Sequence, residues 1–199
     1  YYMTKIISLV NQKGGVGKTT TSINLSASLG VLKKKVLLVD LDPQGNTTTG
    51  LGVNKGEIKA SIYDVLNGDS PIKKAIKKTS FDLLSIIPAT INLAGIDYEL
   101  LEKGHNDSEF KKNEQLRNAL IEVKDNYDYI IIDCPPSLGV LTTNALVASD
   151  SVIIPVQCEF FALEGISQLL NTIIMTQTRL NPNLKIEGVL LTLLDSRTN

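Results

Sequence analysis

A glycine- and lysine-rich segment near the N-terminus constrains the fold of this chain more than any other feature. It reads KGGVGKTT from Lys13 to Thr20, and it lies between an apolar run at 6–10 and a helical pattern at 19–32. A strand, a glycine-rich turn and a helix in this order are typical of a phosphate-binding loop. The segment therefore predicts an α/β fold with a phosphate site after its first strand.

The backbone of this segment is expected to hold the phosphates. Gly14, Gly15 and Gly17 have no side chains, so the N–H groups around Val16 are free to turn toward phosphate oxygens. The N-terminus of the following helix adds a favourable dipole. The alternative is a glycine-rich turn with incidental lysines, and the flanking strand and helix patterns argue against it.

Side chains at the start of the helix predict a nucleotide and a metal ion as ligands. Lys18 is expected to reach the terminal phosphates, and the Thr19 hydroxyl is expected to ligate Mg²⁺. Thr20 is placed to bond the α-phosphate. Asn11, just before the loop, fits two roles equally well, namely binding phosphate and capping the strand.

Further apolar runs predict a doubly wound, mostly parallel α/β sheet flanked by helices. The runs do not alternate with polar residues, as expected for strands covered on both faces. Expected strands cover 36–40, 83–87, 129–133, 152–156 and part of 186–194, and expected helices cover 109–124 and 162–180. Loops and short helices are expected between residues 45 and 68.

Aspartates follow two of these expected strands. Asp40 and Asp42 close the second run, and Asp133 closes the run at 129–133. Carboxylates at the carboxyl ends of parallel strands face the crevice in which ligands bind. Four apolar residues before Asp133 form a Walker B pattern, which predicts that Asp133 holds Mg²⁺ through water. Strand alternation would put Asp40 and Asp42 on one side, and the alternative is that these aspartates cap the following turns.

Composition narrows the function classes. The 199 residues carry 20 Lys+Arg and 21 Asp+Glu, and a net charge of −1 argues against coating of nucleic acid by bulk positive charge. Two separated cysteines, Cys134 and Cys158, suit a reducing cytoplasm and are expected to be buried small hydrophobes. We expect one domain over residues 3–199, cut short at its C-terminus because no covering helix follows the last strand. Residues 1–2 are expected to be a remnant that precedes the native start.

The phosphate loop resembles the deviant Walker A motif of the ParA/MinD/nitrogenase-iron-protein class of P-loop ATPases. Gln12 replaces the first glycine of the plain pattern, and Lys13 is a second lysine. The resemblance implies that Lys13 reaches across a dimer interface to the nucleotide of the partner. It also implies that Asp42 orients the attacking water and that Asp40 belongs to the Mg²⁺ shell.

Three further segments resemble the ParA/Soj family of chromosome- and plasmid-partitioning ATPases. They read DLDPQGN from residue 40, DCPPSLGVLTTNA from residue 133 and PVQCEFFALEG from residue 155. The resemblance implies slow, partner-stimulated ATP hydrolysis with Mg²⁺ in a bacterial, cytoplasmic and nucleoid-associated protein. It implies an ATP-bound homodimer that binds DNA non-specifically and is stimulated by a ParB-like centromere-binding protein. The alternatives are a ParA-like positioner of another cargo and a MinD-type ATPase that cycles on membranes, although no membrane partner is expected.

Two places are candidates for DNA contact. Arg197 matches a position that the family resemblance associates with DNA. A helix over 72–78 would stack Lys73 on Lys77 and Lys74 on Lys78, with the alternative that these lysines are only a solvated face.

Overall fold

One mixed sheet organises the residues that the computed structural model describes, which are 3–158 and 162–193. Within these residues, seven strands pair in the order β3-β4-β2-β5-β1-β6-β7. All neighbours are parallel except β3 and β4, which confirms the predicted mostly parallel α/β architecture. The strands are β1 (Lys5–Leu9), β2 (Val36–Asp40), β3 (Lys77–Lys78), β4 (Leu84–Ile87), β5 (Tyr129–Asp133), β6 (Ser151–Gln157) and β7 (Lys185–Thr192).

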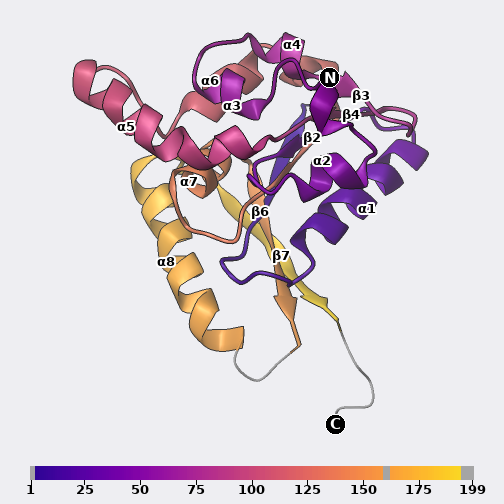
Figure 1. The fold of residues 1–199 in the computed structure, drawn as a ribbon. Coiled ribbons are helices and arrows are strands. Elements are labelled where there is room, and N and C mark those ends of the chain that lie inside the picture. Colours follow the sequence, from indigo (N-terminus) through magenta and orange to yellow (C-terminus); the bar gives the residue numbers. More distant parts are fainter. Residues whose placement is uncertain (1–2, 159–161, 194–199) are drawn as a thin grey trace.

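Helices cover both faces of the sheet, as Figure 1 shows. On one face lie α1 (Lys18–Val31) and the short α2 (Asn46–Gly50). The other face is covered by α3 (Ile62–Leu66), α4 (Ile72–Ala75), α5 (Ile96–Asn106), α6 (Gln115–Ile121), α7 (Val140–Ala148) and α8 (Ala162–Arg179). Short 3₁₀ turns are η1 (Lys55–Glu57), η2 (Ile91–Gly95) and η3 (Lys124–Asn126).

The apolar core has two layers, one on each side of the sheet. In β2, Leu37 and Val39 pack into the layer beneath α3 to α8, whereas Val36 and Leu38 pack beneath α1. All four side chains are fully buried. A strand that is covered on both faces needs apolar residues at consecutive positions, which explains the unbroken apolar run in the sequence.

The helix expected over 109–124 is shorter in the structure. Its regular part is α6, and turns precede it. The side chain of Asn144, on α7, accepts a 3.1 Å hydrogen bond from the Leu116 N–H and so satisfies a donor in the first turn of α6. A contact from a distant helix therefore fixes where α6 starts, and local periodicity does not contain that information.

The lysine helix expected over 72–78 is wrong in its second half. Helix α4 ends at Ala75, Ile76 is extended, and Lys77 and Lys78 form the edge strand β3, antiparallel to β4. Pairing with an open sheet edge satisfies more backbone groups than one more helical turn would. The predicted stacking of Lys73 on Lys77 and of Lys74 on Lys78 is thereby lost.

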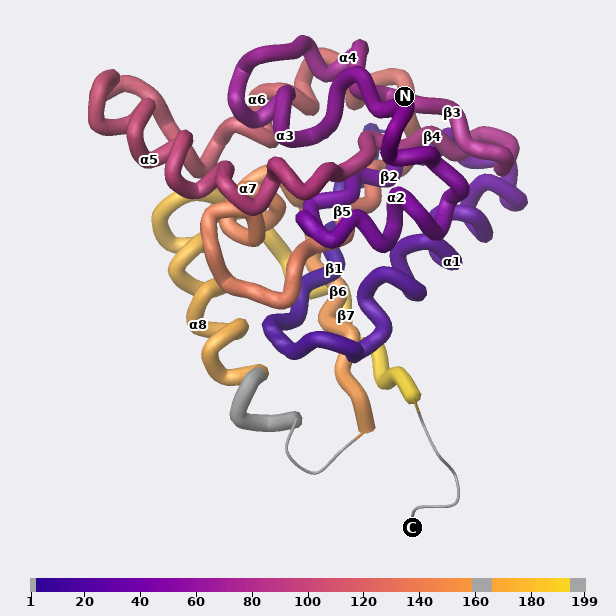
Figure 2. The backbone as a smooth tube through the Cα atoms, in the orientation of Figure 1, coloured from indigo at the N-terminus to yellow at the C-terminus, as the bar shows by residue number. Residues whose placement is uncertain are grey.

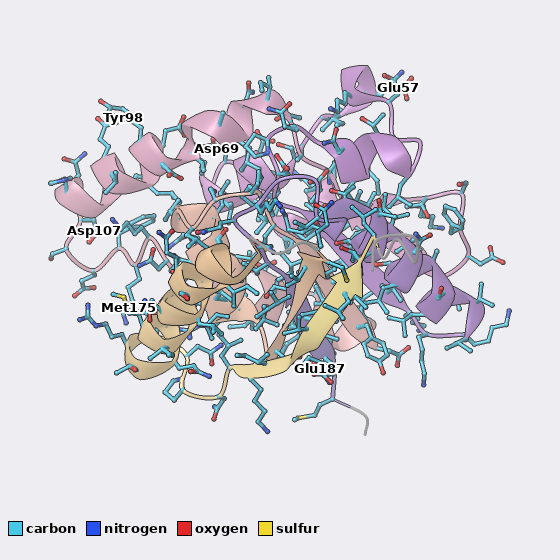
Figure 3. The ribbon with its side chains drawn as sticks, turned by 90° about the horizontal axis from the view of Figure 1, so that it is seen from below. Glu57, Asp69, Tyr98, Asp107, Met175 and Glu187 are labelled. Carbon is cyan, nitrogen blue, oxygen red and sulfur yellow. The ribbon has the colours of Figure 1, made fainter. Side chains whose placement is uncertain are left out.

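Strand β7 forms the other edge of the sheet, and its side chains are largely exposed. Leu191 is 65% exposed, and Val189 and Ile186 are also open to solvent. Near the start of β7, Glu187 forms a 2.7 Å ion pair with Lys5, and Figure 3 shows Glu187 at the rim of the sheet. Within residues 3–158 and 162–193, no helix has the length and apolar character needed to cross a membrane.

Candidate active site

The candidate site lies where three neighbouring strands end. The phosphate loop follows β1, Asp40 ends β2 and Asp133 ends β5. Strand β5 lies between the other two, so Asp133 is in register with Leu9 on one side and with Asp40 on the other. The chain passes from β1 to β2 by skipping over β5, and such a switch in strand order opens a crevice at the carboxyl ends of the strands. Figure 2 shows the phosphate loop at this end, between β1 and α1.

Two glycines give the phosphate loop its shape. Gly15 and Gly17 have φ angles of 75° and 85°, a left-handed conformation that side chains disfavour. A Cβ atom added to Gly14 or Gly15 would meet no atom within 4 Å, so space is open beside this part of the loop. Val16 is buried, with 1% of the residue exposed, so its side chain anchors the loop against the core.

Lys18 closes over the loop from the first turn of α1. Its side chain is drawn inward, with the residue 7% exposed, and its ammonium donates a 3.0 Å hydrogen bond to the Lys13 carbonyl oxygen. Burial lowers the pKa of Lys18, and the nearby charges of Asp133 and Asp42 oppose that shift. A desolvated ammonium of this kind interacts strongly with an anion that enters the loop.

Hydroxyl groups from α1 and α2 surround the carboxylate of Asp133. Its carboxylate accepts hydrogen bonds from Thr19 at 2.9 Å, from Ser22 at 3.1 Å and from Thr47 at 2.5 Å. The residue is 1% exposed, and burial raises its pKa while these bonds act in the opposite direction. Thr19 and Asp133, which were predicted separately from two motifs, therefore meet directly.

Asp40, expected to belong to the Mg²⁺ shell, ends β2 and bonds the turn that follows. Its buried carboxylate accepts hydrogen bonds from the Thr48 N–H at 2.8 Å, the Thr48 hydroxyl at 2.6 Å and the Asp42 N–H at 3.1 Å. Both carboxylate oxygens are engaged, so the geometry favours the alternative role of fixing the turn into α2. Burial raises the pKa of Asp40 to about 7.

Asp42 lies in the turn that follows β2 and is half-buried. Its Oδ1 accepts a 2.9 Å hydrogen bond from the Gln44 N–H, and Lys55 donates a 2.7 Å hydrogen bond to the Gln44 carbonyl oxygen. Strand β2 ends at Asp40, so the expected strand alternation does not extend to Asp42. The turn instead presents Asp42 near the Lys18 ammonium, where the two charges interact.

The remaining predicted loop residues fall into two groups. Lys13 and Thr20 are exposed at the rim of the loop. Asn11 is buried; its amide donates a 2.7 Å hydrogen bond to the Pro155 carbonyl oxygen and its side-chain oxygen accepts one of 2.9 Å from the Lys13 N–H. Of the two roles left open for Asn11, the structure favours capping.

Other predictions have mixed outcomes. Cys134 is buried as expected, and burial raises its pKa well above the usual thiol value. Cys158 is exposed, so the prediction that it is a buried hydrophobe is wrong; it lies just past the end of β6, where the sheet gives little cover. Arg197 lies outside the described residues.

Sequence reasoning missed the hydroxyl groups that surround the two buried aspartates. Thr47 bonds Asp133, Thr48 bonds Asp40, and Ser22 completes the set from α1. The run Asn46-Thr47-Thr48-Thr49 carries a signal, because closely spaced hydroxyls after an aspartate-terminated strand suit buried carboxylates. The composition of residues 45–68 by itself predicts only loops and short helices.

The residues present fit a magnesium–nucleotide complex. The open space beside Gly14 and the buried Lys18 ammonium suit phosphate oxygens, and the Thr19 hydroxyl next to Asp133 suits a phosphate-bound Mg²⁺. Within the described part of the chain, no three His, Cys, Asp or Glu side chains gather into a metal site. Mg²⁺ does not need such a cage, because it keeps several waters and binds substrate phosphates.

Comparison with known proteins gives the family. Residues 4–186 match a family model described as an AAA domain. The sporulation initiation inhibitor protein Soj of Bacillus subtilis is 58% identical over 197 residues, which are 99% of this chain and 76% of that protein. The chain belongs to the ParA/Soj family. The chromosome partitioning protein ParA of Myxococcus xanthus is 53% identical over 195 residues, covering 98% of this chain and 67% of that protein.

Solved structures of similar proteins agree with this family and fold. A Mycobacterium smegmatis protein, described as cobyrinic acid a,c-diamide synthase with bound ADP and magnesium, has a TM-score of 0.91 and 44% identity, covering 98% of this chain and 77% of that chain. A plasmid partition protein from Borrelia burgdorferi has a TM-score of 0.80 and 31% identity, covering 98% of this chain and 80% of that chain. The ParA/Soj resemblance that the segments from residues 40, 133 and 155 indicated is thus confirmed, together with the P-loop fold.

Proposed function

We propose that this protein is an ATP-hydrolysing switch for chromosome or plasmid partitioning. The observation that carries the proposal is the pairing of the buried Lys18 ammonium with the Thr19–Asp133 contact at the end of β1. ATP is the nucleotide and Mg²⁺ the metal ion, in keeping with the ADP and magnesium in the Mycobacterium smegmatis structure. Membership in the ParA/Soj family supports partitioning as the process.

The chain's own residues divide the work of hydrolysis. Loop N–H groups and Lys18 bind the phosphates, and Thr19 and Asp133 would hold the metal ion. Asp42 positions the attacking water, because its turn places a half-buried carboxylate near Lys18. Bound Mg²⁺ supplies positive charge that stabilises the charge developing on the phosphate oxygens.

The exposed position of Lys13 supports a role in a homodimer. Its neighbour Lys18 is drawn into the loop, whereas Lys13 lies at the rim, where a second copy could approach. A cation supplied in trans would neutralise charge on the partner's transferred phosphoryl group. Dimerisation would then depend on ATP, and hydrolysis would end it.

The dimer binds DNA without sequence preference in this proposal, and a ParB-like centromere-binding protein stimulates hydrolysis. A net charge of −1 requires a local basic surface, and pairing two copies would double any such surface. Lys73, Lys74 and Lys78 remain exposed although they do not share one helix face, and Arg197 is a second candidate.

A DNA-binding titration tests the proposal. Fluorescence anisotropy of a labelled duplex would be measured with ATP, with ADP and without nucleotide, in two unrelated sequences and between about 50 and 200 mM salt. We expect binding only with ATP, equal for both sequences and weakening steeply with salt. The Lys18→Ala variant should show none. Equal binding with ADP would contradict the switch, and ATP-dependent binding to lipid vesicles in place of DNA would favour a membrane-cycling ATPase.

A further inference from the structure

A side chain on the last described strand contacts the phosphate loop. The Thr192 hydroxyl lies 2.7 Å from the Val16 carbonyl oxygen and donates a hydrogen bond to it. The two residues are 176 positions apart in the sequence, and no loop motif includes Thr192. Figure 2 shows the ends of β6 and β7 beside the loop between β1 and α1.

The backbone of Thr192 is held by the sheet. Thr192 is in register with Gln157 of β6, and its carbonyl oxygen accepts a 3.3 Å hydrogen bond from the Cys158 N–H. Its hydroxyl is also 3.3 Å from the Val156 carbonyl oxygen, but the shorter distance to Val16 identifies the better acceptor. Threonine has a stiff χ1 angle in a strand, so the hydroxyl is a fixed donor.

The contact is made at the point where the loop turns into α1. A Cβ atom added to Gly17 would lie 3.5 Å from the Thr192 methyl carbon, so that methyl group packs against Gly17. The Val16 carbonyl and the Gly17 N–H belong to one planar peptide and point in opposite directions. When Thr192 holds the carbonyl toward β7, the Gly17 N–H is directed away from β7.

We propose that Thr192 is a positioning residue of the nucleotide site, which orients the Gly17 N–H toward phosphate by holding the Val16 carbonyl oxygen. The inference rests on the proposed ATP-binding function. Gly17 has a φ of 85°, and a glycine at this point allows the peptide to rotate easily. A donor on β7 removes that freedom before nucleotide binds, so less entropy is lost on binding.

Two variants separate this role from a general contribution to folding. Thr192→Val keeps the branched shape and the methyl contact with Gly17 but removes the hydroxyl, whereas Thr192→Ser keeps the hydroxyl. Thr178→Val is the matched control, because the exposed Thr178 hydroxyl bonds the Ile174 carbonyl oxygen, at 2.8 Å, within α8. The Kd for ADP would be measured by calorimetry on the full chain, and melting temperatures would be recorded without nucleotide.

We expect Thr192→Val to weaken ADP binding about tenfold, as loss of one oriented hydrogen bond predicts. The same variant should raise KM for ATP more than it lowers kcat, and Thr192→Ser should recover most of the affinity. Thr178→Val should bind ADP as the wild type does. A lower melting temperature with wild-type ADP affinity in folded Thr192→Val would overturn the inference and leave the ATPase proposal standing. A wild-type protein that binds neither ADP nor ATP would overturn both.

Discussion

The Lys18 ammonium lies 3.0 Å from the carbonyl oxygen of Lys13, so the second lysine of the loop closes over the peptide of the first. One lysine is therefore committed to the interior of its own loop, while the side chain of the other lies at the rim. The two cations of the motif cannot substitute for each other in this arrangement. Their removal should have different consequences.

Removal of the Lys18 side chain should abolish productive nucleotide binding. Lys18→Ala deletes the cation inside the loop, and we expect ATP affinity to fall about a hundredfold or more, as for loss of a charged hydrogen bond. Isothermal titration with ATP measures the change. Lys73→Ala removes an exposed lysine on α4 and serves as the control, with affinity expected to equal that of the wild type. Unchanged ATP affinity in Lys18→Ala would refute the assignment of the loop.

Replacement of Asp42 should separate dimerisation from hydrolysis. We expect Asp42→Ala to form the ATP dimer but to hydrolyse ATP about a hundredfold more slowly, because the attacking water loses its positioning carboxylate. Light scattering with ATP reports the dimer, and phosphate release reports turnover. Asp82→Ala, at an exposed turn, is the control. Wild-type turnover in Asp42→Ala would mean that another group positions the water.

Lys13 should act on the nucleotide of the partner. Lys13→Ala alone and Asp42→Ala alone should both be nearly inactive. In a mixed dimer, the Lys13→Ala subunit keeps its own Asp42 and receives Lys13 from the other subunit, so one site regains turnover. Phosphate release from titrated mixtures measures the effect. Mixtures no more active than the two separate variants would argue that Lys13 acts within its own subunit.

Asp40 should make stability fall as pH rises. Its folded pKa of about 7 lies above the ordinary value of 3.8, so the unfolded chain releases this proton first. The unfolding free energy therefore decreases between about pH 4 and 7, by at most on the order of 4 kcal/mol. Neighbouring Asp133 raises the pKa of Asp40 and contributes in the same direction, since its own pKa is raised too.

Urea unfolding at several pH values tests this dependence. Asp40→Asn should flatten the slope of unfolding free energy against pH, whatever its effect on absolute stability. Asp82→Asn, which changes an exposed carboxylate, should keep the wild-type slope. Parallel slopes for the wild type and Asp40→Asn would show that Asp40 is not the group responsible.

The residues of this site that are close together in the sequence could be predicted, but most contacts between distant segments could not. The loop from Lys13 to Thr20 could be recognised because a short segment carries its glycines, its lysines and the start of α1. The sequence predicts that Thr19 and Asp133 lie near each other, because Asp133 ends a parallel strand and Thr19 follows the loop after another. The partners of Asp40 and the contact of Thr192 with the loop depend on where other segments pack. The hydrophobic periodicity of the sequence does not predict such contacts.

The same distinction explains the errors in secondary structure. Helix α4 stops early because β4 offers an open edge to Lys77 and Lys78. Strand β2, in contrast, is predicted with its observed bounds of Val36–Asp40, because its consecutive apolar residues indicate a strand that is buried on both faces. Elements that are defined by their own side chains are predictable, and elements that are defined by a neighbour are not.

The strand order has a consequence for how this protein is made. Strand β1 pairs only with β5 and β6 among the described strands. Lys5 therefore cannot pair before Tyr129 has been synthesised, and Ile7 cannot pair with β6 before Ser151 has been synthesised. A ribosome must release the chain as far as Asp133, about two thirds of the 199 residues, before the first strand has either neighbour. Until then the emerging chain exposes apolar strands with open edges, a state that invites aggregation. Nascent chains should thus need chaperone protection long after the nucleotide loop has been translated.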